Sequence, residues 1–171
     1  MGSGVVIEDK PTETRLAESP VVVSDLTRLL VLADEAAEQK RPLSVRDLSA
    51  LCYLLGTDPE ADVLSCSYRY RFSPGPTSAE FEADLAQLET SRYTERRSPL
   101  KVSPRGKAWL EESNRAADVR RLREIARRVL PQYLGDDDLV ARTFRRSQEI
   151  TRRALERDLA MLRDQERRSA R

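Results

Sequence analysis

Residues able to carry out acid–base or metal chemistry are scarce in this sequence. There is no histidine, which removes the commonest general base and a common metal ligand. The two cysteines, Cys52 and Cys66, form no C-x-x-C pair and are too few for a zinc site. The acidic run Asp136–Asp138 could bind a divalent cation, but negative charge at the start of a helix explains it better. We therefore predict a protein that is not an enzyme, with no catalytic residue, metal ion or cofactor.

Arginines are the side chains with the greatest capacity for binding, and they are unevenly distributed. Residues 1–115 carry 15 Lys and Arg against 19 Asp and Glu, whereas residues 116–171 carry 15 against 10. Every basic residue of the second segment is an arginine. A basic tail indicates a nucleic acid or an acidic protein surface as the partner. Solvated helices with i,i+4 ion pairs, such as Glu149–Arg153 and Arg152–Glu156, are the alternative.

The cations best placed for binding lie around one expected turn and along the last expected helix. Neutralisation of phosphates supplies much of the affinity of proteins for DNA, so side chains of this kind can follow a nucleic-acid backbone. The predicted DNA- or partner-binding residues are Arg96, Arg97, Lys101, Arg105, Lys107, Arg142, Arg145, Arg146, Arg152 and Arg153.

Two helices are expected in the first third of the chain. The first begins at Ser19–Pro20 or at Ser24, each a suitable capping position. The second begins at Ser44, which forms a capping box with Asp47. Cys52 lies in the apolar stripe of this second helix, so we expect a buried structural thiol rather than a reactive one.

Short extended pieces and two further helices are expected in the middle of the chain. Residues 67–72 alternate aromatic residues with arginines, which is typical of a strand. A capping box at Thr77–Glu80 opens a helix that we expect to bury Phe81, Leu85 and Leu88. Two extended pieces around Ser98–Pro99 predict a β-hairpin, and Ser103–Pro104 predicts the start of the next helix.

The remaining residues predict two tail helices. The first has Val119, Leu122, Ala126, Val129 and Tyr133 on one face. The second spans about residues 137–167, and its apolar stripe is interrupted at Ser147 and Thr151. This helix can bury its stripe on the preceding domain or on the same helix of a second copy. The interruption argues against a continuous coiled coil and favours a short helical-bundle contact that includes the first tail helix. The predicted dimerisation residues are Phe144, Leu155, Leu159 and Leu162.

The order helix, helix, helix and hairpin resembles the winged-helix superfamily. Residues 77–88 look like the third helix of that fold, residues 93–96 look like the first wing strand, and residues 100–106 resemble its common "lt-x-x-G" ending. Residues 70–78 are similar to the "F-x-x-Y-G-P-Y-S" segment of YwgA-like and, more loosely, Panacea-type prokaryotic proteins, with Pro74 in place of the tyrosine. The resemblance implies a winged helix with a short β-hairpin wing. Together with the two tail helices expected from the spacing of apolar residues, it predicts a mainly α (α+β) protein.

The expected third helix is unusual for a winged helix that reads DNA. Its exposed side carries Glu80, Glu82, Asp84, Gln87 and Glu89, and carboxylates repel phosphates. We therefore expect a winged-helix regulatory homodimer that contacts DNA through wing and tail arginines. The alternative is a protein–protein adaptor, or an antitoxin-like neutraliser, that uses the winged helix as a platform.

Three segments and a compartment complete the interpretation. We expect a loosely held arm at 1–18, a winged-helix domain at 19–115, and a helical extension at 116–171 for dimerisation or partner binding. No apolar run approaches the roughly 20 residues of a membrane span, and no signal peptide is evident at the start. The expected location is the cytoplasm, without membrane contact.

Overall fold

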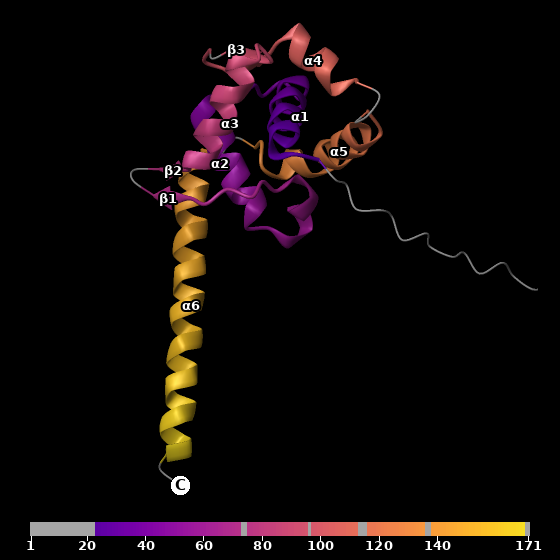
Figure 1. Cartoon of the computed structure of the whole chain (residues 1–171). Coiled ribbons are helices and arrows are strands. Elements are labelled where there is room, and N and C mark those ends of the chain that lie inside the picture. Colours follow the sequence, from indigo (N-terminus) through magenta and orange to yellow (C-terminus); the bar gives the residue numbers. More distant parts are fainter. Residues whose placement is uncertain (1–22, 73–74, 96, 113–115, 136–137, 170–171) are drawn as a thin grey trace, which may run out of the picture.

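The computed structural model describes residues 23–72, 75–95, 97–112, 116–135 and 138–169, and it is mainly helical. Figure 1 shows a globular body from which one long helix projects. The helices of the first half are α1 (Asp25–Glu38), α2 (Val45–Gly56), the 3-10 turn η1 (Pro59–Leu64) and α3 (Ala79–Thr90). The second half contains α4 (Pro104–Leu110), α5 (Ala116–Val129), the 3-10 turn η2 (Leu130–Gln132) and α6 (Leu139–Ser169).

Hydroxyl side chains fix where four of these helices begin. Of the two predicted starts of α1, Ser24 is the cap, and Ser19–Pro20 lies outside the described residues. The predicted capping box of α2 is confirmed, because Ser44 Oγ accepts from Asp47 N at 3.1 Å. In α3 the cap is Ser78, one residue later than predicted. Ser103 caps α4 as predicted, with Pro104 at its first position.

Two small antiparallel hairpins connect the helices. The first joins β1 (Arg71–Phe72) to β2 (Pro76–Thr77), so the predicted strand at 67–72 is confirmed only at its end. The second joins β3 (Thr94–Glu95) to β4 (Lys101–Val102), which confirms the predicted hairpin.

Gly106 fits α4 closely against the second hairpin. A Cβ at this position would collide with the carbonyl oxygen of Tyr93, which directly precedes β3. Only glycine allows this approach of the two backbones. The glycine that ends the wing-like segment therefore has a packing role.

One hydrophobic core includes both halves of the chain. Phe81, Leu85 and Leu88 are buried in it as predicted, and Cys52 is 1% exposed. The core also contains residues of α5, η2 and the first turn of α6, namely Val119, Leu122, Ala126, Val129, Leu130, Tyr133, Leu139 and Val140.

The predicted extension at 116–171 therefore shares the core of the preceding residues as far as the start of α6. The face of α5 that we expected to join a dimer contact is buried within its own chain, against α1 and η1, so that expectation is wrong. Only the later part of α6 extends beyond the body (Figure 1).

Among the described helices, none is long and apolar enough to cross a lipid bilayer.

Candidate binding surfaces

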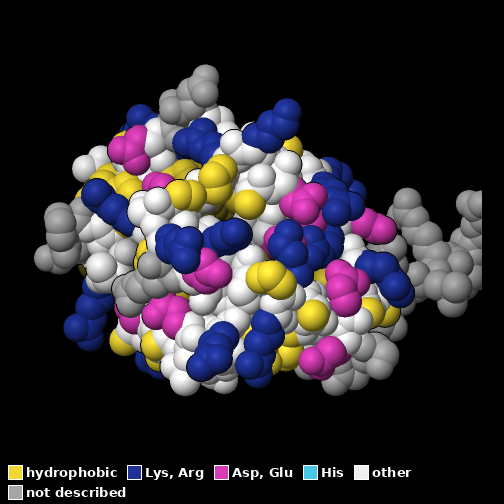
Figure 2. Space-filling view, turned by 90° about the horizontal axis from the view of Figure 1, so that it is seen from above, with side chains coloured by type: hydrophobic (Ala, Val, Ile, Leu, Met, Phe, Trp, Pro, Cys, Tyr) yellow, Lys and Arg dark blue, Asp and Glu magenta, His cyan; other side chains and the backbone are white. Residues whose placement is uncertain are grey.

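Two of the four described wing cations lie beside acidic partners, so the wing does not present an unbroken basic track. Arg97 Nε is 3.1 Å from Glu95 Oε2, and Lys107 Nζ is 3.1 Å from Asp34 Oδ1. The Arg105 guanidinium lies over the Tyr93 ring, 5.7 Å from its centroid. Lys101 is exposed, and Arg96 lies outside the described residues. Figure 2 shows basic and acidic side chains interspersed over the upper face of the body.

The exposed side of α3 is acidic, as the sequence predicted. Glu82 and Gln87 are exposed, and Glu80 is 3.4 Å from Arg69. Asp84 is partly buried and accepts a hydrogen bond from Tyr68 Oη at 2.8 Å. Among the described residues, carboxylates outnumber cations on this side of α3, which is unfavourable for entry into a DNA groove.

A buried ionic cluster joins α1 to α5. Arg123 donates to Glu35 Oε1 and to Asp34 Oδ2, both at 2.8 Å, and Arg127 Nε donates to Glu35 Oε2 at 3.0 Å. Burial alone would lower the pKa of Arg123, but its hydrogen bonds to Glu35 and Asp34 outweigh burial and raise it. Two arginines of the basic tail therefore pair with two carboxylates of the acidic first part within the same chain.

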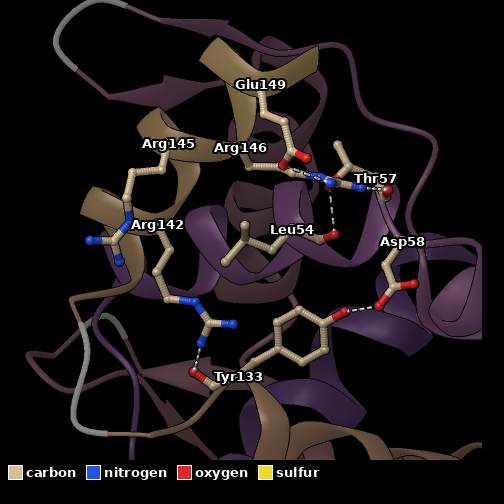
Figure 3. Close-up of a pocket in the computed structure, with 8 residues that line it drawn as sticks. All are labelled: Leu54, Thr57, Asp58, Tyr133, Arg142, Arg145, Arg146 and Glu149. Carbon is tan, nitrogen blue, oxygen red and sulfur yellow. Dashed lines mark hydrogen bonds and ion pairs between the residues drawn. The ribbon is translucent and has the colours of Figure 1, made fainter. Parts of the chain in front are cut away.

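Two of the predicted binding arginines turn inward at the root of α6 (Figure 3). Arg142 donates to the carbonyl oxygens of Gln132 and Tyr133, the latter at 2.9 Å, at the end of η2. Arg146 Nη2 donates to the carbonyl oxygen of Thr57 at 2.8 Å, just beyond the end of α2. Carbonyl groups at helix ends lack intrahelical partners and attract cations. These arginines therefore hold α6 against the body.

Tyr133 and Asp58 lie beside these two arginines and contact each other (Figure 3). Tyr133 Oη donates a hydrogen bond to Asp58 Oδ2, and Asp58 also accepts from the backbone N–H of Glu60. Both hydrogen bonds lower the pKa of Asp58, and the one from Tyr133 has the larger effect. The pKa of Tyr133 is raised, mainly because the side chain is partly buried and secondly because it donates a hydrogen bond to Asp58.

A cavity of about 440 Å³ lies between these side chains, with Leu54, Arg145 and Glu149 also lining it (Figure 3). Arg142 and Arg146 direct donors to protein carbonyls, and Asp58 is occupied by Tyr133 and Glu60. The lining holds three guanidinium groups and two carboxylates, so most of its charge is balanced within the chain. We therefore interpret these contacts as structural. We call the hydrogen bonds of Arg142 and Arg146 to the Tyr133 and Thr57 carbonyls the clasp, because they orient α6 on the body.

Beyond this clasp, α6 projects from the body as an exposed arm (Figure 1). Residues 155–168 are all exposed, and four large apolar side chains lie among them: Leu155 (58% exposed), Leu159 (51%), Met161 (60%) and Leu162 (55%). We call this segment, residues 150–169, the α6 arm. Its predicted pairs are confirmed: Arg153 contacts Glu149, and Arg152 Nε is 3.7 Å from Glu156 Oε1.

The four residues predicted for dimerisation divide into two groups. Leu155, Leu159 and Leu162 lie on the arm, each more than half exposed, and they are not among the described residues in or against the core. Phe144 lies nearer the root, where its ring is 5.7 Å from that of Phe72. It is therefore partly used within its own chain.

Sequence reasoning missed the ionic cluster and a second apolar line on the arm, which contains Ile150 and Met161. The signal for the cluster was present: Asp34 and Glu35 interrupt an otherwise apolar run from Leu29 to Ala36. Among the described residues, no group of three or more potential metal ligands is brought together.

Comparisons with protein-family models, curated proteins and solved structures give no match to this chain.

Proposed function

We propose that this protein is a protein-interaction adaptor, in which a winged-helix-like body presents the α6 arm to a protein partner. The supporting observation is the exposure of Leu155, Leu159 and Leu162, each more than half accessible on a helix that continues well past the body. A helix without tertiary contacts is only marginally stable in water, because its apolar stripe remains unburied. Contiguous exposed apolar side chains mark interaction sites in soluble proteins.

The two cysteines bear on the compartment in which the protein works. Cys52 and Cys66 are free thiols, and both are buried. Unpaired thiols are typical of proteins kept in a reducing compartment. We therefore propose that the protein works in the cytoplasm as a binding protein, without catalysing a reaction.

Site-specific photo-cross-linking in the native host tests the adaptor proposal. Benzoylphenylalanine at Leu159 faces the stripe, and the same group at Ala160, one residue along, faces away from it. We expect a specific protein adduct from position 159 and at most a trace from position 160. The partner identified by mass spectrometry, purified and titrated, should bind Leu159→Asp at least tenfold more weakly than wild type. Equal labelling from both positions, or none, would overturn the proposal.

Regulation through DNA is the second candidate, favoured by the order of α3 and the β3–β4 hairpin and by exposed Lys101 and Arg105 near that hairpin. Electrophoretic titration against random and genomic duplexes over a salt series tests it. DNA binding through these cations would weaken with added salt, and Lys101→Ala with Arg105→Ala would reduce the slope. No shift at low salt would exclude this role.

A further inference from the structure

We propose that the partner of the α6 arm is a second copy of the chain, with the two arms packed antiparallel around Leu159. This inference rests on the proposed adaptor function and adds the identity and orientation of the partner. Leu155, Leu159 and Leu162 follow the i, i+4, i+7 spacing that places them on one face of a helix. They form a short apolar seam in the middle of the arm.

The charges that flank this seam select the antiparallel orientation. Two antiparallel copies centred on Leu159 bring together residues at equal distances before and after the centre. Arg152 lies seven residues before Leu159 and Glu166 seven after it, so each arginine faces a glutamate of the other copy. Glu156, three before, and Arg163, four after, are one residue out of this register and form a diagonal pair of opposite charges. A parallel pair would instead place Arg152 against Arg152 and Glu166 against Glu166.

The side chains concerned are free to form these contacts. Within the described residues, Arg163 and Glu166 have no ion pair, and Arg152 is held only by an exposed contact to Glu156 of 3.7 Å. Exposed pairs of this kind contribute little, so Arg152 can exchange its partner at small cost.

The length of the arm also fits the antiparallel arrangement. Glu149, where the clasp ends, lies ten residues before Leu159, and Ser169, where α6 ends, lies ten after it. Each body would therefore lie beyond the free end of the other arm, and the bodies would not collide. At 1.5 Å per residue, the paired segment spans about 30 Å. Two bodies held at opposite ends of this rod make an adaptor with two outward-facing ends.

Sedimentation equilibrium of the full chain, with charge-reversal variants, tests the proposal. We expect wild type to dimerise at tens of micromolar, and Arg152→Glu or Glu166→Arg alone to weaken the dimer at least tenfold. The double variant Arg152→Glu/Glu166→Arg restores opposite charges in an antiparallel pair, so its dimer should recover to within about threefold of wild type. In a parallel pair, like charges face each other before and after each change, so neither loss nor rescue would appear.

Two matched controls separate the seam from the rest of the arm. Leu159→Asp should abolish dimerisation, whereas Met161→Asp, at an equally exposed apolar position off the seam, should leave it within threefold. Arg157→Glu, on the far side, reverses a charge without affecting the seam. Circular dichroism checks that the arm remains helical in each variant.

The outcomes separate this inference from the proposed function. A wild-type chain that remains monomeric at 100 µM overturns the second-copy proposal, as does a dimer insensitive to the charge reversals. If that monomeric chain still cross-links a different protein from position 159, the adaptor function stands with another partner. If it cross-links nothing, both proposals fail.

Discussion

Arg123 and Glu35 lie 88 positions apart in the sequence, yet Arg123 Nη1 is 2.8 Å from Glu35 Oε1 in the interior between α1 and α5. Glu35 and its neighbour Asp34 are almost fully buried. Buried carboxylates are tolerated only when they are paired and hydrogen-bonded. The tail arginine Arg123 is therefore needed to neutralise buried carboxylates of α1, and it is not available to an external partner.

Replacement of Arg123 by leucine should destabilise the body strongly. Among the described residues, it would leave Asp34 paired with exposed Lys107 and Glu35 paired with half-exposed Arg127. Removal of one partner from a buried ion pair costs about 3–5 kcal/mol. Arg120→Leu, at an exposed position on the same helix, should change the free energy of unfolding by less than about 0.5 kcal/mol. Urea unfolding of the two variants measures the difference, and equal effects would contradict a structural role for the cluster.

The clasp at the root of α6 gives a second prediction. Arg146→Ala removes the donor to the Thr57 carbonyl and should cost about 1–3 kcal/mol, as hydrogen bonds from charged groups do. Backbone amides at residues 139–150 should then exchange faster with deuterium. Arg153→Ala, which breaks only a largely exposed pair with Glu149, should cost less than about 1 kcal/mol. If Arg146→Ala left both quantities unchanged, Arg146 would be a surface residue free for other partners.

The sequence predicted those features that depend on neighbouring residues. The Ser44–Asp47 capping box and the Ser103–Pro104 start are local hydrogen-bond patterns, and the burial of Phe81, Leu85 and Leu88 follows from helical spacing. Such signals lie within about one or two helical turns, where spacing along the chain determines contact in space.

The parts that sequence could not supply depend on contacts across the fold. Arginines look alike in a sequence whether they face water or a helix end. Only the packing of α6 against α2 turns Arg142 and Arg146 toward the Tyr133 and Thr57 carbonyls. The apolar stripe of α6 is interrupted at Ser147, and in the structure the buried residues of α6 end shortly before it, at Thr143.

A pH dependence is expected from the Tyr133–Asp58 hydrogen bond. The lowered pKa of Asp58 means that its ionised form stabilises the fold. This stabilisation is present above the unfolded pKa of about 4 and is lost as the pH falls through the lower folded pKa. Tyr133→Phe should therefore cost about 1 kcal/mol at pH 7, and the difference from wild type should shrink below about pH 4.

Urea titrations at pH 7, 5 and 3 measure this difference. Tyr53→Phe is the matched control, because the Tyr53 hydroxyl has no hydrogen bond within the described residues. It should have little effect at any pH. A Tyr133→Phe deficit that is the same at pH 3 and pH 7 would show that ionised Asp58 is not the group stabilised.

The position at which the chain can be shortened follows from the burial of α6. Leu139 and Thr143 are 1% and 0% exposed, and Val140 is 5% exposed. A chain ending at Gly135 loses these side chains together with the Arg142 and Arg146 contacts, and should lose about 4 kcal/mol or more of stability. A chain ending at Ile150 keeps the core and the clasp, and should unfold within about 1 kcal/mol of wild type. It should also be monomeric, because it lacks the Leu155–Leu162 seam. Urea unfolding and sedimentation of both chains decide this, and a stable, fully folded chain ending at Gly135 would show that α6 is dispensable to the body.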